Sequence, residues 1–216
     1  MIKNRDLNKK ETRFLSYLNN QEDFPFKGDF FKFLLVSSKA SKESIYNFFD
    51  GFLINILIYE CDNYYLVIYQ NKEKLELENF IEMFNDDMGT RSMIFEGFTI
   101  KKDNYLFLQD FLDIFDSKYS FNKMYSKISD LVLICNNDRL LLNKLNRIVL
   151  DKYIDDKGFI NLVRTLFKNN LNVSKTAKDL YMHRNTLNNK LNVFERETTL
   201  SIQNFIDAVA IYELLK

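Results

Sequence analysis

Residues 172–194 read NVSKTAKDLYMHRNTLNNKLNVF, and this stretch decides the fold of the C-terminal part of the chain. It predicts two helices, a short one over residues 174–181 that is capped by Ser174 and a second one over residues 184–196. Residues 182–183 interrupt the helical pattern between them. Two helices joined by so short a turn have the form of a helix-turn-helix.

The second of these helices has two different faces. Leu187, Leu191 and Phe194 follow one another at steps of four and three residues, so they form one apolar stripe. The opposite face is polar and carries Arg184, Asn185, Asn188, Asn189 and Asn192, with Lys190 at its edge. The major groove of DNA admits one helix, and Asn and Arg side chains pair with the edges of adenine and guanine. This face therefore predicts a protein that binds double-stranded DNA.

The expected contacts with DNA are of two kinds. The candidates for base edges are Arg184, Asn185 and Asn188. The candidates for phosphate contacts are Ser174, Lys175, Thr176, Lys178 and Lys190. His183, the single histidine of the sequence, is expected to cap or pack in the turn, with a phosphate contact as the alternative. The competing interpretation of the whole set is an ordinary solvated helix face.

Charge is distributed unevenly along the chain. Thirty Lys and Arg residues balance thirty Asp and Glu residues overall, but residues 157–216 carry a net charge of +4 and residues 1–156 a net charge of −4. A basic segment suits a polyanionic partner, whereas an acidic segment repels one. The charge thus places the DNA-binding function in the last quarter of the chain.

The N-terminal part of the chain predicts a different fold. Residues 1–29 comprise a helix over residues 5–20 and a linker. Residues 30–120 follow with a strand over 31–37, a helix capped by Ser41, and a hairpin of strands 54–60 and 64–70. Apolar residues between positions 75 and 84 then mark a helix that ends at Gly89, and a strand over 92–100 completes the pattern. This order is the ferredoxin-like one, a sheet with helices on one face.

The rest of the chain is expected to be helical. Further helices are predicted over residues 104–115, 121–135 and 138–153. Residues 121–156 form a helical connector, and residues 157–216 form an all-α domain of four helices, the last of which is capped by Ser201. The fold class is therefore α+β, a ferredoxin-like α/β sandwich followed by a helix-turn-helix domain.

The helix-turn-helix stretch resembles the C-terminal DNA-binding domain of the PucR/CdaR family of bacterial regulators. The hallmark of that family is tA..L..HrNTl.yRl in a Fis-like helix-turn-helix, and the matching positions are Thr176, Ala177, Leu180, His183, Arg184, Asn185, Thr186, Leu187 and Leu191. The resemblance covers residues 159–210. It adds His183 and Thr186 to the expected DNA contacts, and it implies a degenerate middle domain similar to the diguanylate-cyclase (GGDEF) fold. The family's usual Tyr and Arg before Leu191 are Asn189 and Lys190 here, so the stacking and bidentate contacts of that pair are not carried over.

Several other classes of protein fit the sequence poorly. The predicted hairpin turn at residues 61–64 has no glycine, which an active cyclase needs where its backbone approaches a triphosphate, and there is no P-loop or GxGxxG. One histidine excludes an HExxH zinc site. We therefore expect no enzymatic activity, no catalytic residue, no metal and no cofactor. Cys61 and Cys135 are expected to be buried free thiols, and no signal peptide or membrane-spanning run is predicted, so the expected location is the cytoplasm.

These observations predict a sequence-specific DNA-binding transcriptional regulator. A homodimer is expected, because helix-turn-helix proteins gain affinity from two half-sites. The middle domain is expected to act as an assembly platform or as a sensor, and the sequence leaves open whether a small-molecule effector exists. The alternative is a signalling or scaffold protein whose helix-turn-helix has decayed into a protein-binding surface and no longer binds DNA. A third and weaker alternative is a small-molecule-binding enzyme that uses the middle domain.

Overall fold

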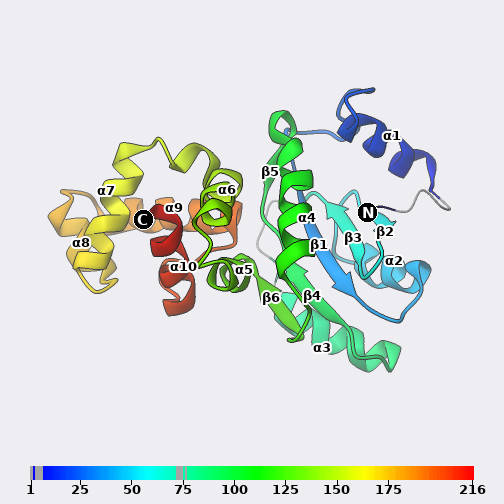
Figure 1. Cartoon of the computed structure of the whole chain (residues 1–216). Coiled ribbons are helices and arrows are strands. Elements are labelled where there is room, and N and C mark those ends of the chain that lie inside the picture. The colour runs from blue at the N-terminus through cyan, green and yellow to red at the C-terminus, as the bar shows by residue number, and fades with distance from the viewer. Residues whose placement is uncertain (1, 3–6, 72–74, 76) are drawn as a thin grey trace. The chain divides into compact units, whose positions relative to one another are not determined.

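The computed structural model describes residues 2, 7–71, 75 and 77–216. The chain forms two compact units, Met1–Lys127 and Ile128–Lys216 (Figure 1). The first unit combines a sheet with helices and the second is built from helices, which confirms the α+β class. Within the described residues, no helix has the length and apolar character needed to cross a membrane.

Both units contain short elements joined by short turns. The N-terminal unit consists of α1 (Lys9–Leu18), β1 (Phe30–Ser37), α2 (Lys42–Asp50), β2 (Leu57–Glu60), β3 (Tyr65–Tyr69), α3 (Leu77–Met88), β4 (Met93–Glu96), β5 (Ile100–Lys101), the 3-10 turn η1 (Lys102–Asn104), α4 (Leu106–Lys118) and β6 (Tyr125–Lys127). The C-terminal unit consists of α5 (Ile128–Ile134), α6 (Arg139–Leu150), the 3-10 turn η2 (Asp151–Tyr153), α7 (Lys157–Lys168), α8 (Val173–Asp179), α9 (Arg184–Thr198) and α10 (Phe205–Leu215). The predicted alternation of strands and helices up to β4 is confirmed.

The sheet is organised around β1. Its strand order is β2-β3-β1-β4-β6, and β5 also pairs with β1. All neighbours are antiparallel except β4 and β6, which are parallel. Six consecutive residues of β1, Phe31–Val36, are buried, so both faces of this strand are covered. That explains why its sequence is an unbroken run of large side chains with only Lys32 among them.

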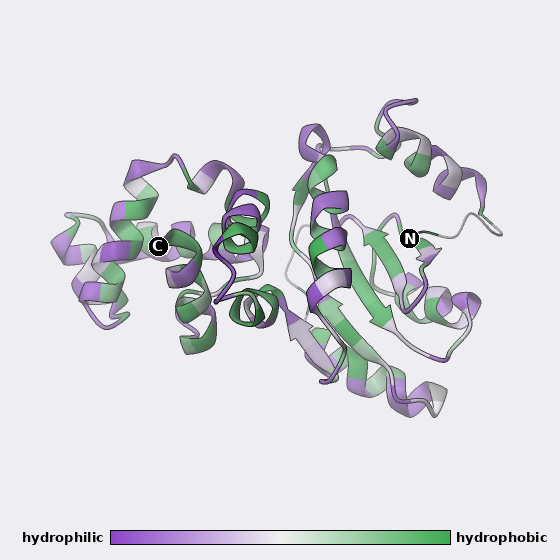
Figure 2. Cartoon of the chain, viewed as in Figure 1, coloured by the Kyte–Doolittle hydropathy of each residue, from purple (hydrophilic) through white to green (hydrophobic). Residues whose placement is uncertain are grey.

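Helices cover both faces of the sheet, and the expectation of helices on one face is wrong. On one face, Phe49 of α2 and Phe84 of α3 pack in a single core with Leu34 of β1. On the other face, α4 packs through aromatic rings: the rings of Phe33 and Phe111 lie 5.2 Å apart, centroid to centroid. Figure 2 shows the central strands of the sheet as mostly hydrophobic, and α4 as a helix that carries both hydrophobic and hydrophilic residues.

Two predicted elements differ from the structure because pairing between distant strands overrides the local pattern. Residues 121–135 were expected to form one helix, but residues 125–127 form β6 alongside β4, and only α5 is helical. The expected strand over residues 92–100 is divided into β4 and β5. The division lies at Gly97, where an added Cβ would stand 2.5 Å from the ring of Phe33. The close approach of this ring requires glycine at that position.

The two cysteines are buried free thiols, as predicted. Burial raises the pKa of the Cys61 thiol to about 11. A thiol that stays protonated at neutral pH is a poor nucleophile, so Cys61 behaves as a small apolar core residue.

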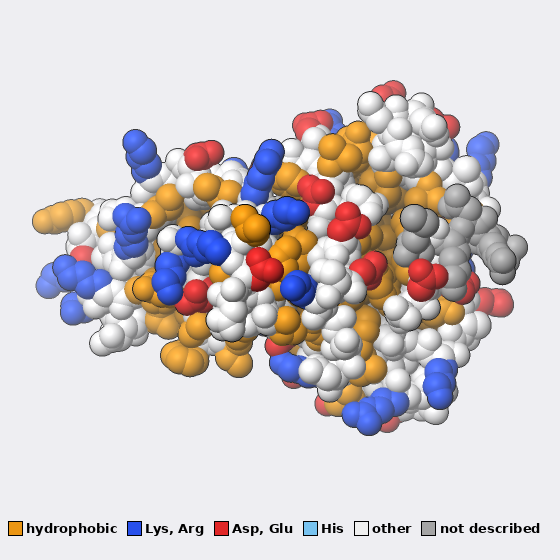
Figure 3. Space-filling model, viewed as in Figure 1, with side chains coloured by type: hydrophobic (Ala, Val, Ile, Leu, Met, Phe, Trp, Pro, Cys, Tyr) orange, Lys and Arg blue, Asp and Glu red, His pale blue; other side chains and the backbone are white. Residues whose placement is uncertain are grey.

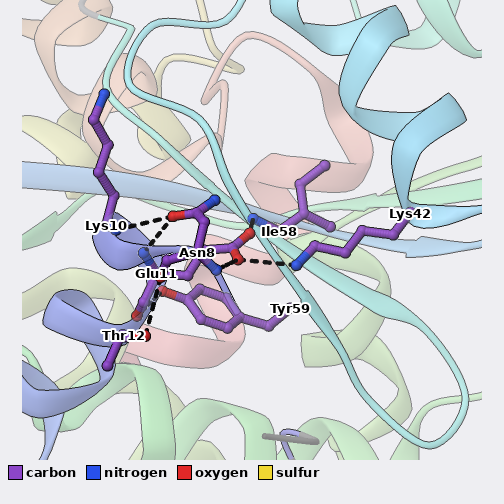
Figure 4. Close-up of polar contacts among 7 residues, drawn as sticks. All are labelled: Asn8, Lys10, Glu11, Thr12, Lys42, Ile58 and Tyr59. Atoms are coloured by element: carbon purple, nitrogen blue, oxygen red, sulfur yellow. Dashed lines mark hydrogen bonds and ion pairs between the residues drawn. The ribbon is translucent and has the colours of Figure 1, made fainter. Parts of the chain in front are cut away.

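A buried carboxylate attaches α1 to the rest of the N-terminal unit (Figure 4). Glu11 is 2% exposed, and its Oε2 accepts a hydrogen bond from the Asn8 backbone N–H (2.8 Å) and pairs with Nζ of Lys42 (2.9 Å). Its Oε1 accepts a hydrogen bond from the backbone N–H of Ile58 in the outer strand β2 (3.2 Å). The hydroxyl of Tyr59 donates to the backbone carbonyl of Glu11 (2.9 Å). One residue therefore connects α1 with α2 and β2.

Replacing Glu11 by Ala should lower the free energy of unfolding of the N-terminal unit by about 2–4 kcal/mol, because it leaves the buried Ile58 N–H without its acceptor and breaks the ion pair with the partly exposed Lys42. The matched control is Arg13→Ala, which removes an exposed pair with Glu22 (3.4 Å) on the same helix and should cost less than about 1 kcal/mol. Urea-dependent hydrogen exchange of peptides from α1 and β2 measures both losses. Equal losses in the two variants would contradict the role given to Glu11.

Candidate nucleic-acid interface

Each helix from α7 to α10 is preceded by a residue whose polar side chain accepts a hydrogen bond from the first turn of that helix. These N-cap residues are Asp156, Asn172, His183 and Asn204. The predicted caps Ser174 and Ser201 are wrong. Oδ1 of Asn172 accepts the bond from the N–H of Lys175 (2.9 Å), so α8 starts earlier than expected. The N–H of Ser201 instead donates to the buried carboxylate of Asp207 (2.9 Å), and α10 starts at Phe205.

The buried side chain of Asn169 holds α7 against α8. Its Nδ2 donates to Oγ1 of Thr176 (3.3 Å) and to Oδ2 of Asp179 (2.8 Å), both on α8. Its backbone N–H also closes the last turn of α7. This one amide therefore links the end of α7 to two positions on the first helix of the motif.

An aromatic cluster holds α9 in place. The rings of Tyr153 in η2, Phe159 in α7 and Phe194 in α9 lie 4.6–5.0 Å from one another. Leu187 and Leu191 are buried on the same side of α9 as Phe194, as predicted. The apolar stripe of α9 is therefore fully used inside the unit, and its polar face points outward.

The outward face of α9 is rich in amides. Asn185 lies near its start, and steps of four, seven and eleven residues return to the same side of a helix. The residues at those steps are Asn189, Asn192 and Arg196, and all of them are exposed. Arg184 and Asn188 lie on one flank of this row. On the other flank, a groove of about 650 Å³ is lined by Thr186, Asn189 and Lys190 of α9 together with Asn161 of α7 and Lys152 of η2.

Nine of the ten predicted DNA contacts reach the surface. Eight of them are exposed: Ser174, Lys175, Lys178, His183, Arg184, Asn185, Thr186 and Lys190. Asn188 is half-buried. The exception is Thr176, which has no exposed surface and accepts the hydrogen bond from Asn169. Its side chain is a structural part of the α7–α8 junction, so the expectation of a phosphate contact is dropped.

The structural role expected for His183 is confirmed. Its Nδ1 accepts a hydrogen bond from the backbone N–H of Asn185 (3.2 Å) and so caps α9. An accepting Nδ1 places the ring proton on Nε2 in the neutral tautomer. Because the ring is exposed, this N–H faces solvent at the start of the helix.

Comparison with known proteins gives one family match within this unit and two more distant similarities. Residues 159–216 match the PucR C-terminal helix-turn-helix domain. A protein of Bacillus subtilis (strain 168), YsfB, is 33% identical over 73 residues, which are 34% of this chain and 20% of that protein. Among solved structures, the regulator of polyketide synthase expression from Bifidobacterium adolescentis aligns with a TM-score of 0.42 at 16% identity, over 95% of this chain and 90% of that one.

Three exposed residues of the PucR-type domain were absent from the predicted contacts. They are Asn189, Asn192 and Arg196. The signal that finds them is the helical spacing from Asn185. The sequence places Asn189 and Asn192 on the polar face, and the helix predicted over residues 184–196 already reaches Arg196; in the structure it continues to Thr198.

Hydrogen bonding within the C-terminal unit occupies several of its acidic side chains. Glu197 pairs with Lys152 (2.8 Å) and accepts a hydrogen bond from the Tyr153 hydroxyl (2.8 Å), while Asp179 is bound to Asn169. Burial and the bond to Glu197 raise the pKa of the Tyr153 phenol, so it stays a donor at neutral pH. Figure 3 shows Lys and Arg side chains spread over the visible face of this unit. Such a surface favours an anionic partner.

Replacing Asn169 by Ala should destabilise the PucR-type domain by about 1–3 kcal/mol, because the buried hydroxyl of Thr176 loses its donor and the bond to the exposed Asp179 is lost as well. Asn161→Ala is the matched control, since Asn161 is an exposed amide of the same helix and its loss should change stability by less than about 0.5 kcal/mol. Urea-dependent hydrogen exchange of α8 and α9 peptides reports both values. A loss for Asn169→Ala no larger than for the control would show that the junction does not depend on this amide.

Proposed function

We propose that this protein is a sequence-specific DNA-binding transcriptional regulator of the cytoplasm and that α9 is its recognition helix. The observation that carries the proposal is the exposed row of amides and guanidinium groups on α9, whose opposite side is buried in a PucR-type domain. Asn and Arg are the side chains that pair bidentately with adenine and guanine. A scaffold surface, the alternative, has no need for such a row.

The proposed contacts divide into base edges and phosphates. Base edges are assigned to Arg184, Asn185 and Asn188, to which the exposed position of Asn189 adds a fourth. Phosphates are assigned to Ser174, Lys175, Lys178, His183, Thr186 and Lys190. The start of α9 enters the groove in this arrangement, while α8 crosses the backbone.

For the N-terminal unit we propose a degenerate, GGDEF-like member of the ferredoxin-like folds. The antiparallel order β2-β3-β1-β4, with α2 before β2 and α3 before β4, supports this assignment. The β2–β3 hairpin turns through Cys61, Asp62, Asn63 and Tyr64 without glycine, which speaks against a nucleotide there. Its proposed task is sensing or assembly and not catalysis.

Alanine substitutions should separate the two kinds of DNA contact. Lys175→Ala and Lys178→Ala should weaken binding equally on all sequences and reduce the salt dependence of log K by about one unit each. Arg184→Ala and Asn185→Ala should cost about 1–3 kcal/mol on the preferred site and relax its sequence preference. Fluorescence anisotropy at two salt concentrations measures the affinity and its salt dependence for each variant. The two DNA ligands are a random sequence and the fragment that genome-wide mapping of bound DNA finds most enriched.

Lys144→Ala is the control for these substitutions, because Lys144 is an exposed lysine of α6, outside the helix-turn-helix. It should leave both affinity and salt dependence unchanged. A wild-type protein with no preference between its best genomic fragment and random DNA contradicts the sequence-specific function. The scaffold alternative expects no salt-dependent affinity for DNA at all.

We further propose that two copies bind DNA as a homodimer, since one such motif offers few base contacts and dimers read two half-sites. Helix α10 supports this, because it is apolar on most sides and exposes Phe205, Ile206 and Tyr212. An apolar face exposed on a helix of this kind is typical of an interface between subunits.

Phe205→Glu should convert the dimer into a monomer, because a charge would then lie in the proposed interface. Leu140→Glu is the control: Leu140 of α6 is 77% exposed and Phe205 is 76% exposed, so both side chains accept the change equally well. Light scattering should give twice the 25.9 kDa chain mass for wild type and control. A wild-type monomer, both free and on palindromic DNA, would disprove the dimer.

A further inference from the structure

Tyr181 occupies an unusual position in the turn between α8 and α9. Its backbone is left-handed, with φ of 50°, and its side chain is 98% exposed. The N–H of Tyr181 donates to the carbonyl of Lys178 (3.1 Å), and the N–H of Met182 donates to the carbonyl of Ala177 (2.8 Å). These bonds close the C-terminus of α8 in the manner that usually has glycine at the left-handed position.

Most of the other non-glycine residues with positive φ have a reason that Tyr181 lacks. Among the described residues, three of the other six are Asn, which adopts this conformation readily: Asn20, Asn55 and Asn170. Asp151 combines φ of 41° with ψ of −113° and so has a different backbone conformation. Leu171 and Thr199 are partly buried, so their side chains contribute to packing. Within the described residues, the side chain of Tyr181 makes no hydrogen bond, ion pair or ring contact. The two backbone hydrogen bonds hold the turn in this conformation, but no side-chain interaction within the described residues accounts for a tyrosine there. Backbone outliers of this kind cluster at functional sites.

The position of the turn indicates what this side chain meets. It leads directly into the cap His183 and into Arg184 and Asn185, the residues proposed to enter the groove. The major groove is about 12 Å wide, and a helix with its side chains is about 10–12 Å across, so the helix nearly fills it. The chain that leads into the start of α9 must then pass the groove wall, which is made of deoxyribose and phosphate.

We propose that Tyr181 is a DNA-backbone contact that lies beside the recognition helix: its ring packs on a deoxyribose and its hydroxyl donates to a phosphate oxygen. This inference rests on the proposed function. A tyrosine suits such a contact because it combines an apolar ring with a hydrogen-bond donor, and most contacts of this kind position a protein on DNA without reading its sequence. The contact involves no charge, so it adds nothing to the release of counterions.

The decisive variant is Tyr181→Gly, because glycine relieves the backbone strain while it removes the side chain. Its melting temperature should equal or exceed that of wild type. Its affinity should fall about twentyfold on preferred and random DNA alike, with an unchanged salt dependence. Tyr181→Phe keeps the ring and should lower the affinity for DNA about fivefold, because it removes only the hydrogen bond of the hydroxyl.

Asn170→Gly is the matched control, since Asn170 is also exposed and left-handed but lies in the turn before α8. Its DNA affinity should stay within about twofold of wild type. Fluorescence anisotropy at two salt concentrations, thermal melting and light scattering are measured on the full chain for all variants.

The outcomes separate this inference from the function on which it rests. If wild type binds DNA, Arg184→Ala weakens that binding and Tyr181→Gly leaves it unchanged, the contact is disproved and the function stands. If Tyr181→Gly abolishes the dimer without changing the affinity of the monomer, Tyr181 contacts protein and the inference is also wrong. If wild type shows no salt-dependent affinity for any DNA, the proposed function fails, and this contact fails with it.

Discussion

The surface that the C-terminal unit presents depends on one apolar stripe. Leu187, Leu191 and Phe194 can be buried only if α9 turns them toward η2 and α7, and the ring cluster with Tyr153 and Phe159 leaves a single rotation of the helix that does so. The amide row on the opposite side follows from that rotation. In such a helix, recognition is specified by packing, since the core side chains decide which polar ones meet a partner.

How far the sequence predicts this structure differs between the two units. The helix-turn-helix is local: periodicity and a break at residues 182–183 are enough to place α8, α9 and the buried stripe. Thr176 shows the limit of that reasoning, because its hydroxyl looks available until Asn169, seven residues earlier, is seen to bind it. In the N-terminal unit the errors arise from long-range pairing. β6 is three residues long and exists because β4 lies beside it, and the second helical layer exists because α4 folds back onto Phe33 and Phe95.

The two units also differ in net charge. The difference has the same sign whether the boundary is placed before residue 157, as in the sequence analysis, or before residue 128, where the compact units meet. Residues 128–216 carry thirteen basic and ten acidic side chains, so the remaining residues 1–127 have the opposite net charge. α5 and α6, which were expected to connect the domains, pack with α10 inside the C-terminal unit. A helix-turn-helix supported by four additional helices, α5, α6, α7 and α10, has a larger core than the motif alone can provide.

The buried carboxylate of Glu11 has a consequence for solubility. β2 is an outer strand of the sheet, and a strand in that position offers its free backbone groups to any other strand it encounters. Glu11 occupies one of those groups, the N–H of Ile58, and brings α1 alongside to cover the edge. α1 therefore hinders the addition of a strand from another molecule at this edge. If α1 detached, the edge of β2 would become accessible with Leu57, Ile58 and Tyr59, three consecutive apolar residues of high strand propensity, and two such chains would be able to pair there.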